Sequence, residues 1–184
     1  MKKETFNLPN ILTLLRIVVI PLIVATFFFK GGFSAWLGGL MFVAAAITDY
    51  FDGYFARKLQ LVSKFGRFLD PIADKVLVSS VLLMLAYKGG LAYFGIIPAL
   101  IILCREILVS GLREFLAESN VSMPVSRLAK WKTAFQLISL PLLIVGDHGF
   151  YFNELGSGLL WFSAVLTMIT GYDYLKSGFK YINN

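Results

Sequence analysis

Cysteine, histidine and charge are all scarce in this sequence. Its 184 residues include one cysteine and one histidine, and only 15% are Asp, Glu, Lys or Arg. A single cysteine, Cys104, excludes a disulfide framework and a thiolate metal site. A water-soluble domain carries about 25% charged residues, so this chain has too little polar surface to cover a globule in water. We therefore expect an integral membrane protein.

Apolar residues make up 58% of the chain, and they gather in long runs with few charges. A helix needs about 20 largely apolar residues to cross the hydrocarbon core of a bilayer. Six stretches approach that length, and several are completed only by turns that carry a charge, such as those of Arg16, Asp70 and Asp74. The stretches are 8–29, 31–48, 70–87, 89–116, 133–146 and 155–172. The fold class predicted is an all-α integral membrane protein with six transmembrane helices.

The basic residues between these stretches predict the orientation. Lysine and arginine accumulate in cytoplasmic loops. With both termini cytoplasmic, the outer loops hold only Lys30 and Lys88 of the basic residues. The net charge of +6 is explained by this topology, so we expect no nucleic-acid partner. His148 falls in the last outer loop and is expected to be a surface residue. With no internal repeat or linker, residues 1–184 are expected to form a single domain.

Two pairs of aspartates stand at the inner ends of the second and third stretches. Asp49 and Asp52 are three residues apart, and Asp70 and Asp74 are four apart. Each pair therefore lies on one face of a helix, with Cβ atoms roughly 5–6 Å apart. The short connection between the two helices predicts an antiparallel hairpin, which brings both pairs to the same depth near the cytoplasmic boundary. Four carboxylates are expected to converge there.

Four like charges near a low-dielectric medium repel one another and require cations. Because every ligand is an oxygen, hard divalent ions fit, either Mg²⁺ or Mn²⁺. Two such ions could clamp a diphosphate and activate a leaving phosphate. Arg57 offers a positive fork to phosphate oxygens, and Gly53 lets a ligand approach the backbone.

Two other interpretations of the aspartates are open. Charged residues at helix ends often mark only the boundary with water. Carboxylates within a membrane also serve as ion or proton relays, although a relay predicts acids near the midplane of the bilayer rather than at the ends of the spans.

The aspartates also belong to a longer string. Residues 49–74 read D-x-x-D-G-x-x-A-R, then eight residues, then G-x-x-x-D-x-x-x-D. This string resembles the signature of the CDP-alcohol phosphatidyltransferases, integral membrane enzymes of phospholipid synthesis. The resemblance implies two divalent metals on the four aspartates, with the diphosphate of a CDP-linked donor across them and Asp74 as the base. It further implies donor-binding roles for a set of residues in and before the string: Gly53, Arg57, Gly66, Asn10 and Thr13, with Arg16 beside them.

A second cluster is basic and follows the fourth stretch. Arg105 and Glu106 interrupt an apolar span, so we expect each to be satisfied by the other or by a neighbour. Beyond them lie Arg113, then Arg127 and Lys130. A cationic pocket near a two-metal site suits an anionic acceptor, and a phosphomonoester is the natural candidate. The alternative is that these charges serve only topology and anionic headgroups. The residues predicted to bind the acceptor phosphate are Arg105, Arg113, Arg127, Lys130, Lys132 and Ser126.

The stretch R-E-I-x-V-S-G-L-R-E at 105–114, with K-x-K-T-x-x-Q at 130–136, resembles the branch of the family that makes phosphatidylglycerol phosphate. This implies CDP-diacylglycerol as donor, glycerol 3-phosphate as acceptor, and an active site at the cytoplasmic face of the cell membrane. A homodimer is typical of the family, and the small residues Gly38 and Gly39 would permit close helix packing. Another acceptor, phosphatidylglycerol or inositol phosphate, remains open, as does a small cation transporter. The last span carries no distinctive motif.

Overall fold

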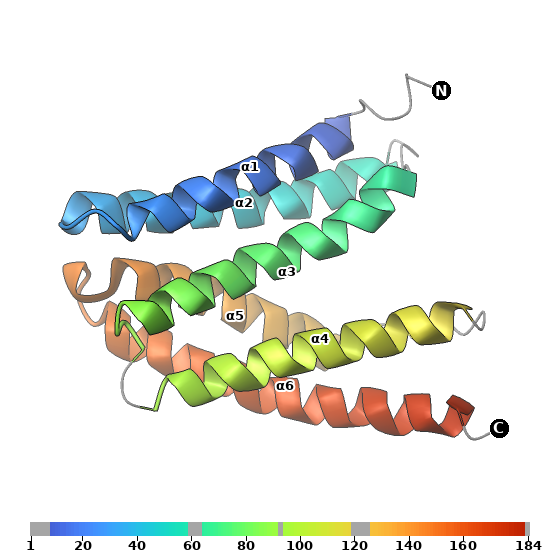
Figure 1. Ribbon diagram of the computed structural model, residues 1–184. Coiled ribbons are helices and arrows are strands. Elements are labelled where there is room, and N and C mark those ends of the chain that lie inside the picture. Colours follow the sequence, from blue (N-terminus) through green and yellow to red (C-terminus); the bar gives the residue numbers. More distant parts are fainter. Residues whose placement is uncertain (1–7, 59–63, 92–93, 119–125, 183–184) are drawn as a thin grey trace. The chain divides into compact units, whose positions relative to one another are not determined.

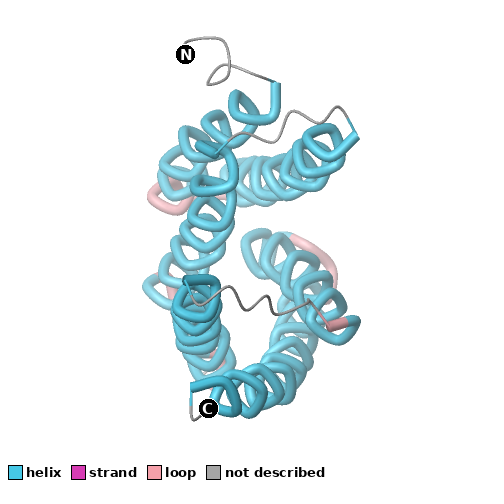
Figure 2. The backbone as a smooth tube through the Cα atoms, turned by 90° about the vertical axis from the view of Figure 1, so that its right-hand side faces the viewer, coloured by secondary structure: helices cyan, strands magenta, loops and turns pink. Residues whose placement is uncertain are grey.

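The structure is a computed structural model that describes residues 8–58, 64–91, 94–118 and 126–182. In these ranges the only regular elements are helices (Figures 1 and 2). They are α1 (Leu8–Thr26), α2 (Gly32–Lys58), α3 (Lys64–Tyr87), α4 (Ile96–Glu118), α5 (Arg127–Val145), the 3₁₀ turn η1 (Gly146–His148) and α6 (Phe152–Ile182). The predictions of an all-α protein and of six long helices are confirmed.

Three of the described helices are long and apolar enough to cross a membrane: Gly32–Asp49, Arg127–His148 and Phe152–Phe179. A shorter apolar stretch, Asn10–Thr26, lies in α1. Many large apolar side chains point outward along the helices, among them Leu83, which is 61% exposed. An apolar outer surface is stable when it faces lipid. The chain is a membrane protein with apolar helical spans.

Several helices begin or end away from the expected stretches, and at two of them a local cause is visible. The fourth stretch was expected to run from residue 89, but α4 begins at Ile96. The reason is the end of α3: the N–H of Gly90 bonds to the carbonyl of Leu85 at 3.0 Å, and Gly89 has a φ of +71°. A glycine in this left-handed conformation commonly closes a helix.

The other difference lies at the start of α5, which begins at Arg127 rather than at residue 133. Ser126 precedes it, and its Oγ accepts a hydrogen bond from the N–H of Ala129 at 3.2 Å. This is the N-cap arrangement, which satisfies an otherwise unbonded N–H group of the first turn.

The described chain divides into two compact units. Unit 1 contains residues up to Gly90 together with Leu140–Asn153, and in it α1 packs along both α2 and α3. Its buried side chains include Ile23 and Phe42, both fully buried. The expectation of a single domain, 1–184, stays a prediction.

Close packing in unit 1 depends on two glycines of α2. A Cβ added at Gly38 would overlap the Oγ1 of Thr26 and lie 3.2 Å from the Cγ2 of Ile144. One added at Gly39 would lie 2.9 Å from the Cγ2 of Val145. The expectation that these small residues permit close helix packing is confirmed by contacts within the chain.

Unit 2 contains Leu91–Ser139 and Glu154–Asn184, with α4 and most of α5 and α6. Hydroxyl groups link its helices. Ser163 donates to the carbonyl of Lys132 at 3.1 Å, and Ser139 donates to the carbonyl of Gly156 at 2.7 Å. Hydrogen bonds of this kind hold helices together where apolar side chains gain little by leaving lipid.

Candidate active site

Three polar residues of α1 point into unit 1. Asn10, Thr13 and Arg16 follow one another at intervals of three, so they share one face of the helix. Each is only 1% exposed. A buried arginine is costly unless an anion and hydrogen bonds satisfy it. The surroundings of this face therefore have to be acidic.

The anions are two of the predicted aspartates. The Nη1 of Arg16 lies 2.7 Å from the Oδ1 of Asp49 on α2 and 2.9 Å from the Oδ1 of Asp74 on α3. The arginine side chain is fully buried, whereas the two carboxylates are 36% and 48% exposed. One guanidinium nitrogen thus joins carboxylates from two helices, and their other sides remain open to a ligand.

A third predicted aspartate is bound one turn earlier. The hydroxyl of Thr13 donates to the Oδ1 of Asp70 at 2.7 Å. Asp70 and Asp74 are one turn apart on α3, as Thr13 and Arg16 nearly are on α1. The face of α1 therefore meets both acids of α3 in register. The structure brings Asp49, Asp70 and Asp74 to the same face of α1.

The remaining residues of the signature are only partly visible. The backbone of α2 is helical through Asp52, Gly53 and Arg57, but their side chains lie outside the described part of the structure. Gly66 is buried near the start of α3. The donor-binding roles of these residues, and the place of Asp52 in the acidic cluster, stay predictions.

The donor set is suited to hard divalent cations. Among the described residues, which leave out the side chain of Asp52, no group of three acids, histidines or cysteines is close enough to hold a metal ion. The side chains nevertheless suit a divalent cation, because the partly exposed carboxylates of Asp49 on α2 and Asp74 on α3 both contact the guanidinium of Arg16. Oxygen ligands of this kind are those that Mg²⁺ and Mn²⁺ prefer.

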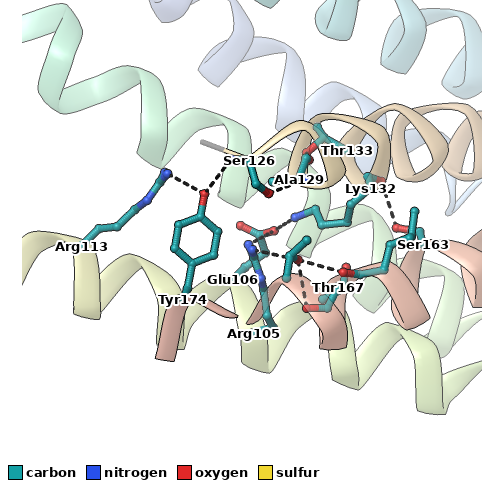
Figure 3. A network of polar contacts seen from close by, with 12 residues as sticks. Arg105, Glu106, Arg113, Ser126, Ala129, Lys132, Thr133, Ser163, Thr167 and Tyr174 are labelled. Atoms are coloured by element: carbon teal, nitrogen blue, oxygen red, sulfur yellow. Dashed lines mark hydrogen bonds and ion pairs between the residues drawn. The ribbon is translucent and has the colours of Figure 1, made fainter. Parts of the chain in front are cut away.

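Unit 2 contains the second predicted cluster, shown in Figure 3. Glu106 of α4 forms ion pairs with Lys132 of α5 and, at 3.5 Å, with Arg105. Arg105 also donates to the Oγ1 of Thr170 on α6 at 3.2 Å. The expectation that Arg105 and Glu106 are satisfied by each other or a neighbour is confirmed. Lys132 is 4% exposed, and its charge is compensated by Glu106.

Arg113 is bound by a residue that sequence analysis missed. Its Nη2 donates to the hydroxyl of Tyr174 at 3.1 Å, and its guanidinium carbon lies 5.0 Å from the centre of the same ring (Figure 3). The backbone N–H of Ser126 donates to that hydroxyl at 3.3 Å. Tyr174 is 6% exposed in a helix from which we expected nothing distinctive. Tyr174 lies two residues beyond the predicted stretch 155–172, where a tyrosine is typical of the membrane boundary, so no signal in the sequence marked it.

Two predicted acceptor residues lie on the surface. Arg127 and Lys130 occupy the first turn of α5 and are exposed. Their charges are available to a ligand from the water phase. Ser126 also is exposed, and its hydroxyl caps α5. Acceptor binding by the whole set stays a prediction.

Comparison with known proteins shows what this chain resembles. A family model described as CDP-alcohol phosphatidyltransferase matches residues 6–169. A protein of Rickettsia felis named CDP-diacylglycerol–glycerol-3-phosphate 3-phosphatidyltransferase is 52% identical over 178 residues, which are 95% of this chain and 97% of that protein. Proteins of the same name are 35% identical in Cereibacter sphaeroides, over 97% of this chain and 98% of the relative, and 37% identical in Arabidopsis thaliana, over 96% and 81%.

Proposed function

The chain belongs to the CDP-alcohol phosphatidyltransferase family, and we propose that it transfers the phosphatidyl group of CDP-diacylglycerol to the 1-hydroxyl of sn-glycerol 3-phosphate. The products are phosphatidylglycerol phosphate and CMP. The observation that carries this proposal is the 52% identity, over nearly the full length of both chains, to relatives named for that reaction. The polar face of α1 against the signature aspartates supports it independently.

We propose that Asp49, Asp52, Asp70 and Asp74 hold two divalent cations, Mg²⁺ or Mn²⁺. When bound, such ions neutralise the donor's diphosphate and stabilise the charge on the departing phosphate. Arg16 fixes the carboxylates of Asp49 and Asp74 relative to each other before any ligand arrives.

Asp74 is the proposed base. It receives the proton of the acceptor's 1-hydroxyl, and the resulting oxygen forms a bond to the β-phosphorus of the donor. The bond from that phosphorus to the CMP oxygen breaks, and CMP departs with the electron pair. The Oδ1 of Asp74 is held by Arg16, and nearly half of the side chain is exposed, which leaves room for a hydroxyl to approach. Gly53 and Arg57, with Asn10, Thr13 and Gly66, are proposed to border the donor.

The acceptor phosphate is proposed to bind the basic residues of unit 2. Lys132 is paired with Glu106, and Arg105 lies beside the same acid, so we assign the main contacts of the phosphate to the exposed Arg127 and Lys130 together with Arg113, which Tyr174 positions. Arginine and lysine bind phosphate oxygens through charge-assisted hydrogen bonds. Ser126, Arg105 and Lys132 complete the predicted set.

The proposal includes the placement of the protein. All six helices are proposed to cross the cell membrane with both termini and the active site at the cytoplasmic face, as the distribution of lysine and arginine indicates. A homodimer is proposed from the family.

The test is an assay of CMP release by the purified protein in detergent. CDP-diacylglycerol is supplied with Mg²⁺ or Mn²⁺ and, in separate samples, with glycerol 3-phosphate, phosphatidylglycerol or inositol phosphate. We expect CMP and phosphatidylglycerol phosphate only with glycerol 3-phosphate and only with metal. Turnover with another acceptor would reassign the substrate, and an absence of CMP in all samples would favour a cation transporter.

The Asp74→Asn variant tests the base. We expect turnover to fall by at least about 100-fold, because general base catalysis contributes about 10²–10⁴-fold. Binding of CDP-diacylglycerol and thermal unfolding should change little. Normal activity in the folded variant would refute the assignment of Asp74.

A further inference from the structure

Unit 1 contains a second polar site, at the end away from the aspartates. A cavity of about 320 Å³ opens where the end of α1, the start of α2, the end of α3 and η1 meet. It lies about 25 Å from Asp49, counted along α2 at about 1.5 Å per residue. Its polar lining residues are Thr26, Lys30, Ser34, Lys88, Asp147, His148 and Asn153.

Two lysines line this cavity. Lys30 and Lys88 are the basic residues that the topology leaves in the outer loops, and both line this one cavity. They come from different connections, one before α2 and one after α3. Two like charges facing a single small space repel each other, and an anion between them relieves that repulsion. The pair therefore favours an anionic ligand.

Hydrogen-bonding groups also line the cavity. Asp147 accepts a hydrogen bond from the side-chain amide of Asn153. The His148 ring lies at the start of α2, with its Nδ1 3.3 Å from the point where a Cβ on Gly32 would stand. A ligand bearing hydroxyl groups beside its negative charge would thus meet both acceptors and cations among the lining residues.

The backbone turns sharply at each connection that forms the cavity. Gly31, Gly89 and Gly146 have φ values of +112°, +71° and +54°. Residues with a side chain rarely adopt such values, so glycine is required for these turns. Gly31 and Gly146 line the cavity directly. Its shape therefore depends on special backbone conformations.

Aromatic side chains place this end of unit 1 at the membrane surface. Several with high exposure surround it: Phe28 at 65%, Phe29 at 67%, Phe33 at 84%, Tyr87 at 74%, Phe150 at 85% and Tyr151 at 67%. Two of them, Tyr87 and Tyr151, are amphipathic, and tyrosine concentrates at the level of the lipid headgroups. At that depth the abundant anion is the phosphate of a phospholipid.

We propose that this cavity binds the headgroup of an anionic phospholipid. The headgroup phosphate lies between Lys30 and Lys88, and the free hydroxyls of the headgroup alcohol face Asp147 and Asn153. A volume of about 320 Å³ is at the lower end of small-molecule sites, which span about 300–1,000 Å³, and suits one headgroup with its acyl chains outside in the bilayer. The site is independent of the proposed reaction.

Lipid binding to the full-length protein in detergent can be measured by native mass spectrometry. The protein is titrated with phosphatidylglycerol, phosphatidylethanolamine or phosphatidylcholine. We compare the wild type with Lys30→Gln and Lys88→Gln, and with Lys176→Gln as a matched control that removes one positive charge from an exposed position of α6. We expect the wild type to bind phosphatidylglycerol about tenfold more tightly than the other two lipids, about the effect of one charge-assisted hydrogen bond.

In the Lys30 and Lys88 variants this preference should vanish, and in Lys176→Gln it should remain. Equal binding of the three lipids to the wild type, or an unchanged preference in the cavity variants, would overturn the proposal. So would an equal loss in the control, which would indicate general charge attraction. Complete displacement of phosphatidylglycerol by inorganic phosphate would identify a site for free phosphate instead. CMP release should be the same in all four proteins, so a failed reaction and a failed lipid site are distinguishable.

Discussion

Arg16 is the residue that organises the acidic site. Its guanidinium reaches Asp49 and Asp74, which are separated from each other by 25 positions in the chain, and it is the only charged residue of α1. The signature string contains neither Arg16 nor Thr13, and the family resemblance named Thr13 only as a donor-binding residue, with Arg16 beside it. Their contacts with α2 and α3 identify a positioning role: they hold the carboxylates where ligands can meet them.

Substitution of Arg16 should destabilise the protein and make its stability depend on metal. Arg16→Ala removes the charge between two carboxylates and should cost about 1.5–3 kcal/mol, as expected for a hydrogen bond to a charged group. We expect added Mg²⁺ to raise the unfolding temperature of the variant more than that of the wild type, because the ion replaces the lost charge. Thermal unfolding in detergent, with and without Mg²⁺, measures both effects.

The matched control is Lys176→Ala, which removes a charge from an exposed position of α6. It should respond to Mg²⁺ as the wild type does. The same response in Arg16→Ala would mean that Arg16 has no part in organising the proposed metal ligands.

Residues of the second cluster differ in what they offer an acceptor. Arg113 combines a hydrogen bond to Tyr174 with a position over its ring, whereas Lys132 is committed to Glu106. The basic residues could be recognised from the sequence, but the partner that each of them contacts could not. These contacts join residues tens of positions apart, which no local pattern encodes.

Arg113→Ala should raise the KM for glycerol 3-phosphate more than the KM for CDP-diacylglycerol. Loss of a charge-assisted hydrogen bond of about 1.5–3 kcal/mol corresponds to roughly a 10- to 100-fold increase. Tyr174→Phe keeps the ring but loses the hydroxyl, so we expect a smaller increase in the same direction. Steady-state kinetics with each substrate varied in turn provide the measurement. Equal increases for both substrates would exclude a specific role in acceptor binding.

At the scale of helices, uncharged runs predict where helices lie, whereas glycines and caps determine where they begin and end. The six helices could be predicted because the uncharged runs are long, and α3 could be predicted because the turns of Asp70 and Asp74 were counted as part of it. The starts of α4 and α5 could not, since they depend on the conformation of Gly89 and on the cap of Ser126. Packing partners were also hidden: Gly38 looked suited to close helix packing, but its contact with Thr26 of the same chain could not be predicted.

Gly38→Ala should therefore destabilise unit 1. The added Cβ meets the hydroxyl of Thr26, which cannot move freely because it donates to the carbonyl of Ile23 at 2.7 Å. Overpacking of this kind costs about 1–3 kcal/mol, more than the roughly 1 kcal/mol that alanine gains over glycine in a helix. Thermal unfolding in detergent should show a lower midpoint.

Gly158→Ala is the comparison, because no heavy atom lies within 4 Å of its added Cβ. It should leave the midpoint unchanged or raise it. If both alanine variants unfold at the same temperature, the contact of Gly38 with Thr26 contributes nothing to stability.

At the scale of the whole molecule, the proposed topology assigns each connection to one side of the membrane. The lysines and arginines of the connections lie almost entirely on one side, and Lys30 and Lys88 lie on the other. Such a bias sets orientation during insertion.

Labelling with a membrane-impermeant maleimide tests this orientation. In a Cys104→Ser background, we place single cysteines at Phe150, in the connection before α6, and at Ser177, near the end of α6. In intact spheroplasts we expect Phe150→Cys to be labelled and Ser177→Cys to be labelled only after lysis. The reverse pattern would invert the protein and move the proposed active site to the outer face.

The pairing of Glu106 with Lys132 also has a consequence for biogenesis. A charged residue at the centre of a single helix raises the free energy of insertion by about 2.5–3.5 kcal/mol. In the proposed topology, Glu106 and Arg105 enter the membrane with α4, and Lys132 enters with α5. Within α4, Glu106 has only Arg105 at 3.5 Å as a partner, and Lys132 adds a second partner from α5, so α4 gains by remaining beside the translocon until α5 has been synthesised. The two helices should then leave for the lipid phase together, as a hairpin whose charges already offset one another.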